Sequence, residues 1–91
     1  MGADEAVEIL KGFRTQIDAV DQQILALLNQ RAGIALQIGE TKRSAGLPVV
    51  ELTRERAVIE GMGARNHGPL SNDAVERIYT AVMLEMRRLQ E

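Results

Sequence analysis

An apolar stripe runs without a break through the first half of the chain. Its residues are spaced by threes and fours: Val7, Leu10, Phe13, Ile17, Val20, Ile24, Leu27, Leu28, Ile34 and Ile38. That spacing places them on one face of an α-helix, and no proline interrupts the pattern before Pro48. A helix over residues 5–44 would be about 60 Å long at 1.5 Å per residue. In a chain of 91 residues, such a helix cannot bury its apolar face against its own chain alone.

Two shorter helices are expected after the long one. The second covers about residues 50–64, and the third runs from about residue 71 to residue 90. Three consecutive residues offer N-caps for the third helix: Ser71, Asn72 and Asp73. Glu76 stands three residues after Asp73, as in a capping box. No strand pattern is present, so the sequence predicts an all-α fold with three helices per chain, one of them very long.

Composition narrows the class of protein. One domain over residues 1–91 is expected, with about residues 1–8 as a flexible lead-in. The net charge is −2, with both signs interspersed, which gives no support to binding of nucleic acid or of a membrane surface. The absence of cysteine removes disulfides, zinc–thiolate sites and cysteine nucleophiles. No apolar run approaches the roughly 20 residues of a membrane span, and we expect a cytoplasmic protein.

Two cations interrupt the apolar stripe. Arg31 and Lys42 are eleven residues apart, which is about three helical turns, so both project from nearly the same face. Burying an unpaired cation is unfavourable. The two side chains can therefore reach solvent or pair with carboxylates from the second helix, or they can bind an anionic ligand. The first of these interpretations holds for most helices taken at random, and the residues alone leave both open.

The second and third helices carry further polar residues with two interpretations each. Glu51 and Glu55 are i,i+4 neighbours on one face of the second helix, with Arg54 beside them. They form either a solvated charged turn or part of a binding site. Met86 and Gln90 share a face near the end of the third helix, where a glutamine usually marks a frayed terminus.

Arg14 lies 17 residues before Arg31, about 25 Å away along the same helix. No metabolite-sized ligand can touch both from one chain. If the long helix pairs antiparallel with a second copy, Arg14 of the partner subunit arrives near Arg31 and Lys42, which makes a shared site with twofold symmetry. The alternative is an exposed arginine near a helix start.

Taken in order, these residues resemble the all-helical chorismate mutase family. The resemblance covers nearly the whole chain, from about residue 13 to residue 90. Its segments read FRTQIDAVD (13–21), ILALL (24–28), Arg31, IGETK (38–42), Pro48-Val49 and TRER (53–56). Each segment is weak alone, but all of them in order and at the family's spacing are specific.

The resemblance implies an intertwined helical homodimer in which two long helices pair and each site uses both chains. It also implies a reaction, the rearrangement of chorismate to prephenate in phenylalanine and tyrosine biosynthesis. This intramolecular [3,3] shift needs no nucleophile, metal or cofactor, and none is expected here. Catalysis would come from selecting a compact substrate conformer and stabilising charge in the transition state.

The resemblance assigns roles to four residues around the substrate's charged groups. Arg31 and the partner's Arg14 would clamp the two carboxylates, because guanidinium groups suit that planar recognition. Lys42 would contact a carboxylate and the ether oxygen, where negative charge grows as the C–O bond breaks. Gln90 would donate a second hydrogen bond to that oxygen.

Four more residues complete the implied substrate site. Glu55 and Glu51 would hold the ring hydroxyl and help to orient Lys42 and the arginines, and Arg54 would add positive potential at the rim. Met86 stands near a carboxylate, where family members often carry a serine. Because methionine cannot donate that hydrogen bond, either substrate binding is weaker here or the pocket has a different shape.

Two other functions compete with the mutase. An isochorismate-pyruvate lyase shares the fold and most of the site, but lacks the pair that Arg54 and Glu55 form here, so the pair favours the mutase. A non-catalytic helical dimerisation or regulatory module is favoured only by Met86, since a simple dimer seam would carry leucine and isoleucine instead of charges. The family's members also occur fused to other aromatic-pathway enzymes, so a fused or bound partner enzyme is expected.

Overall fold

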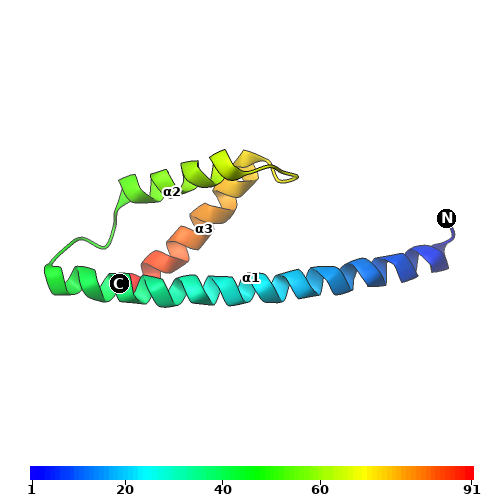
Figure 1. Cartoon of the computed structure of the whole chain (residues 1–91), viewed down its shortest axis with the longest axis horizontal. Helices are drawn as coiled ribbons and strands as arrows, with labels where there is room; N and C mark the ends of the chain where they lie inside the picture. Colours follow the sequence, from blue (N-terminus) through cyan, green and yellow to red (C-terminus); the bar gives the residue numbers. More distant parts are fainter. The chain divides into compact units, whose positions relative to one another are not determined.

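The computed structural model describes all 91 residues, and they form three α-helices (Figure 1). Helix α1 spans Ala3–Ala45, α2 spans Leu52–Arg65 and α3 spans Asn72–Gln90. The predicted all-α fold with a very long first helix is confirmed, and each boundary lies within two residues of its expected position. Because α1 begins at Ala3, most of the expected lead-in is helical.

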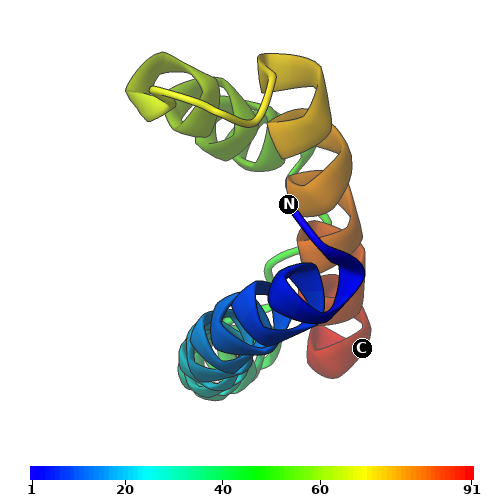
Figure 2. The ribbon, with the colours of Figure 1, turned by 90° about the vertical axis from the view of Figure 1, so that its right-hand side faces the viewer.

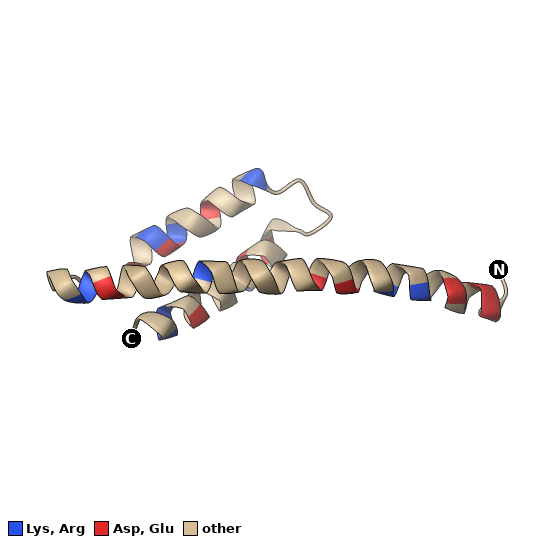
Figure 3. Ribbon diagram, turned by 60° about the horizontal axis from the view of Figure 1, so that its bottom comes forward, with Lys and Arg blue, Asp and Glu red and all other residues tan.

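The chain divides into two compact units, Met1–Arg31 and Ala32–Glu91. The first unit is almost entirely the first part of α1, and its apolar stripe is uncovered in the single chain. Phe13 is 55% exposed, Ile17 59% and Leu27 63%. Charges of both signs are interspersed along α1 (Figure 3). This half of the helix therefore has the surface of an element that packs against another molecule.

The second unit holds the buried apolar side chains. They are few: Ala35, Val75, Met83 and Met86. They come from α1 and α3, and no residue of α2 is fully buried. So small a core supplies little hydrophobic stabilisation for a domain of this length. The single chain therefore buries less than an independently stable domain would need.

Helix α1 ends in a Schellman motif. Gly46 has a φ of +67°, which only glycine adopts readily. Its N–H donates to the carbonyl of Arg43 at 3.3 Å, and the N–H of Leu47 donates to the carbonyl of Lys42 at 2.8 Å. The stop that the glycine predicts is thus formed, and it fixes the turn of helix that carries Lys42.

Helix α3 begins differently from the sequence prediction. Ser71 is the N-cap, and its Oγ accepts a hydrogen bond from the N–H of Ala74 at 3.1 Å. The expected capping box between Asp73 and Glu76 is wrong. Asp73 already lies in the first turn of the helix, and the carboxylate of Glu76 is bound elsewhere.

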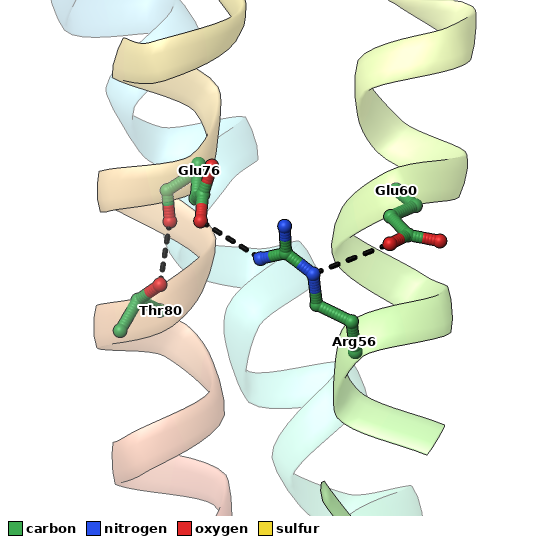
Figure 4. Close-up of polar contacts among 4 residues, drawn as sticks. All are labelled: Arg56, Glu60, Glu76 and Thr80. Atoms are coloured by element: carbon green, nitrogen blue, oxygen red, sulfur yellow. Dashed lines mark hydrogen bonds and ion pairs between the residues drawn. The ribbon is translucent and has the colours of Figure 1, made fainter. Parts of the chain in front are cut away.

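Helices α2 and α3 are joined by a short loop (Figure 2, yellow) and held together by Arg56. The Arg56 guanidinium donates to Glu76 of α3 at 2.9 Å and to Glu60 of its own helix at 3.2 Å (Figure 4). The hydrogen bond and charge of Glu76, followed by those of Glu60, raise the pKa of Arg56. Because all three side chains are largely exposed, the cluster aligns the helices more than it stabilises them.

Candidate active site

Lys42 is the centre of a polar cluster in the second unit. Its side chain is only 12% exposed. The ammonium group lies 3.0 Å from the carbonyl of Val49, 3.3 Å from Oε1 of Gln90 and 3.0 Å from Oε1 of Glu51. An ammonium has three N–H donors, and these three acceptors match them in number. The cation is therefore held inside the fold, paired with a carboxylate from the start of α2.

Glu51 occupies the N-cap position of α2, but its side chain makes no capping hydrogen bond. A carboxylate at this position normally accepts from the first free N–H groups of the helix. Here it reaches back to Lys42 instead. Helix α2 therefore has no side-chain N-cap, and the Glu51 carboxylate balances the charge of Lys42.

Gln90 is docked on α1 by contacts that the sequence did not indicate. A Cβ atom built on Gly39 would lie 3.1 Å from Cα of Gln90 and 3.2 Å from its Cβ and Cγ. The guanidinium of Arg43 also donates to the main-chain carbonyl of Gln90 at 2.8 Å. The end of α3 is thus seated against the last turns of α1, which places the amide of Gln90 beside Lys42.

Glu55 is bound by a residue that the sequence analysis missed. Nη2 of Arg87, on α3, lies 2.7 Å from both carboxylate oxygens of Glu55, on α2. The Glu55 side chain is 19% exposed and that of Arg87 is 30% exposed. Nε of Arg87 is buried without a hydrogen-bond partner. This pair is the more enclosed of the two links between α2 and α3.

The remaining predicted residues lie in several settings. Met86 is buried on α3, at 6% exposure, and Arg54 is exposed in the first turn of α2. Arg14 is exposed and Arg31 half-buried, and both belong to the first unit. The structure thus brings together Lys42 with Glu51 and Gln90 from the predicted set, and the place of the two arginines in the site stays a prediction.

Comparison with known proteins identifies the family. Residues 13–91 match the family model described as "Chorismate mutase type II". The chain belongs to the chorismate mutase type II family. The match includes α2 and α3 in full and all but the first turns of α1, so it covers every residue of the Lys42 cluster.

Bifunctional members of the family are similar in sequence. A bifunctional chorismate mutase/prephenate dehydratase of Aquifex aeolicus is 38% identical over 81 residues, which are 85% of this chain and 22% of the relative. The protein of the same description from Neisseria gonorrhoeae is 41% identical over 78 residues, 86% of this chain and 21% of the relative. The chain therefore spans about a fifth of the length of these relatives.

Solved chorismate mutases have the same fold. The form II structure of the Thermus thermophilus enzyme superposes with a TM-score of 0.88 at 25% identity, covering 89% of this chain and 92% of that one. The Helicobacter pylori chorismate mutase in complex with prephenate superposes with a TM-score of 0.84 at 29% identity, covering 91% and 90%. The predicted family and its isomerase class, chorismate mutase, are confirmed for this domain.

Two further observations concern the helices and the acidic side chains of the chorismate mutase domain. None of its helices is long and apolar enough to cross a membrane. No cluster of histidine, aspartate and glutamate side chains is arranged to hold a metal ion. The acidic side chains of the site are instead taken by Lys42 and Arg87.

Proposed function

We propose that the chain rearranges chorismate to prephenate in a pocket built around Lys42, Gln90, Glu51 and Glu55. The observation that carries the proposal is the enclosed contact between Lys42 and Gln90, which brings residues 48 positions apart within 3.3 Å. The likeness to a chorismate mutase in complex with prephenate supports the same choice of substrate.

The reaction keeps all its bonding electrons within the substrate. The ether C–O bond breaks while a new C–C bond forms, so no group on the protein takes up a proton or becomes covalently attached. What the protein supplies is a compact substrate conformation and stabilisation of the negative charge that develops on the ether oxygen. A cation and a neutral donor beside that oxygen provide the required electrostatics.

The contacts of Gln90 suit it to the role of neutral donor. Its Oε1 accepts from Lys42, so the amide nitrogen, with two N–H donors, points away from the ammonium. Lys42 thereby fixes which end of the amide faces a ligand. The pair presents the ammonium and the amide N–H groups from neighbouring positions, as a developing oxyanion requires.

Lys42 must exchange one of its acceptors when substrate binds. All three donors are matched by protein oxygens. The contact with Gln90 is the longest of the three, at 3.3 Å, and is the one that a substrate oxygen replaces most easily. A substrate oxygen that takes this place on Lys42 can also accept from the amide N–H groups of Gln90, which keeps the amide oriented once its contact with Lys42 is given up. The carbonyl of Val49 and the carboxylate of Glu51 then keep the ammonium in place.

The remaining roles follow the family resemblance. Glu55 and Glu51 receive the ring hydroxyl of the substrate, and Arg54 adds positive potential at the rim. Met86 lines the pocket without a hydrogen bond to a carboxylate. Arg31 binds one substrate carboxylate.

We also propose that the active form is a homodimer in which the partner's Arg14 completes the site. The uncovered stripe on α1, with side chains such as Phe13 and Ile17 more than half exposed, supports this. At about 25 cal/mol per Å² of apolar surface, pairing two such helices is a large stabilising term for a chain with so small a core.

A second partner is proposed from the relatives. Those relatives join a chorismate mutase to a prephenate dehydratase, and this chain spans only about a fifth of their length. We propose that the domain works fused to, or bound by, an enzyme that consumes prephenate.

The test is conversion of chorismate by the purified chain. Loss of substrate is followed directly, and the product is identified after acid conversion of prephenate to phenylpyruvate. Prephenate formation supports the proposal. A folded protein that leaves chorismate unchanged contradicts it, and release of pyruvate from isochorismate would move the assignment to the lyase.

A further inference from the structure

We propose that Arg87 is a positioning residue for Glu55. The inference rests on the proposed function, in which Glu55 receives the substrate's ring hydroxyl. Arg87 itself is not assigned any contact with substrate. Its role is to hold the Glu55 carboxylate in one orientation and to balance its charge.

The geometry singles out this arginine. A single nitrogen of Arg87 bridges both oxygens of Glu55 at 2.7 Å, across the interface between α2 and α3. The side chains of the pair are 30% and 19% exposed. The neighbouring Arg88 makes an equally short contact with Glu85, but those side chains are 61% and 63% exposed and lie one turn apart on one helix. Of these two arginine pairs, only that of Arg87 is enclosed and joins two helices.

The pairing leaves Glu55 able to bind a hydroxyl. A carboxylate offers about four lone-pair sites, and Arg87 occupies one on each oxygen. The sites that remain can accept from a substrate O–H without breaking the ion pair. A glutamate held in this way has lost most of its rotamer freedom before substrate arrives, so less entropy is lost on binding.

Charge gives a second reason for the arginine. The proposed substrate carries two carboxylates, and a bare glutamate beside it would repel it. Arg87 neutralises Glu55 locally while keeping it an acceptor. The two 2.7 Å contacts from Nη2 of Arg87 to the Glu55 carboxylate set the orientation of both groups.

The experiment compares Arg87→Met with Arg88→Met, a matched change one residue away. We expect Arg87→Met to lower kcat by about tenfold or more, as loss of a hydrogen bond to a charged group typically does, with a smaller change in KM. Arg88→Met should leave kcat within about twofold, because exposed pairs contribute little. Arg87→Lys keeps the charge and should recover part of the loss. Melting temperatures of all variants are measured alongside.

Arg87 could also act only by holding α2 and α3 together. To separate this structural role from positioning of Glu55, Arg87→Met is repeated in a Glu55→Gln background. If Arg87 acts through Glu55, Arg87→Met costs much less activity there than in the native background. Equal losses in both backgrounds, or a folded Arg87→Met protein with native kcat, would overturn the inference. If Arg87→Met does not fold, Arg87→Lys is compared in the two backgrounds in its place. An inert parent chain would instead count against the proposed function itself.

Discussion

Replacing Gly39 by alanine tests how the end of α3 is seated on α1. In the structure, a Cβ at this position lies 3.1 Å from Cα of Gln90 and 3.2 Å from its Cβ and Cγ. Carbon atoms pack best at about 3.5–4.0 Å, so the end of α3 must move outward by a few tenths of an ångström. That movement shifts the amide that the proposed mechanism places at the ether oxygen.

The expected effect on stability is small because two terms oppose each other. Alanine is about 0.5–1 kcal/mol more favourable than glycine inside a helix. Overpacking costs about 1–3 kcal/mol, and it is limited by the option of lifting Gln90 off, which gives up two hydrogen bonds worth about 0.5–1.5 kcal/mol each. The free energy of unfolding should therefore fall by no more than about 2.5 kcal/mol.

The loss of activity should exceed what the loss of stability explains. A displacement of about 1 Å at a reacting centre can lower the rate by about a hundredfold, so a shift of a few tenths of an ångström should lower it severalfold to about tenfold. We expect Gly39→Ala to lose about that much kcat while it stays folded under the assay conditions, with both proteins compared at the same protein concentration. A Cβ atom built on Gly33, on the same helix, would meet nothing within 4 Å. Gly33→Ala is therefore the control, expected to gain about 0.5–1 kcal/mol and to keep full activity. Native kcat in Gly39→Ala would refute the argument.

Three further outcomes are expected. Met86→Ser supplies a hydrogen-bond donor in the pocket and should lower KM severalfold without unfolding the protein. KM is measured by substrate titration. An unchanged KM would mean that position 86 is far from the substrate carboxylate. Turnover should vary little across neutral pH, because the amide of Gln90 donates a hydrogen bond without titrating. A steep rise toward acid in a pH–rate profile would contradict the role of Gln90. Glu51→Gln removes the counter-charge of Lys42 and should reduce kcat/KM by about tenfold, whereas an unchanged value would show that the negative charge of Glu51 is not needed.

The helices were predictable because their signals are local. Apolar residues at threes and fours, the glycine after Ala45 and a serine before α3 act within one or two turns of their own position. The capping-box prediction was wrong because the interaction that decides it is not local. Glu76 is drawn to Arg56, 20 residues away, and no local pattern reports that competition.

The site was predictable only in part. The residues alone allowed two interpretations of Lys42, an ordinary ion pair or part of a ligand site. The family resemblance favoured the ligand site. The partner of Glu55 was missed because Arg87 reads as a basic residue in the last turn of a helix, where such residues are common. Likewise, the requirement for Gly39 arises from a contact with Gln90, 51 positions away in the chain, which spacing cannot reveal.

The measurement that tests the account most directly is activity recovery from two inactive variants. Arg14→Ala and Lys42→Ala are each expected to lose nearly all activity as homodimers. When they are mixed in equal amounts and allowed to exchange, about half the dimers are mixed, and each mixed dimer holds one site with both native residues if the site is shared. The account predicts recovery of about a quarter of native activity. No recovery despite confirmed mixed dimers would contradict it.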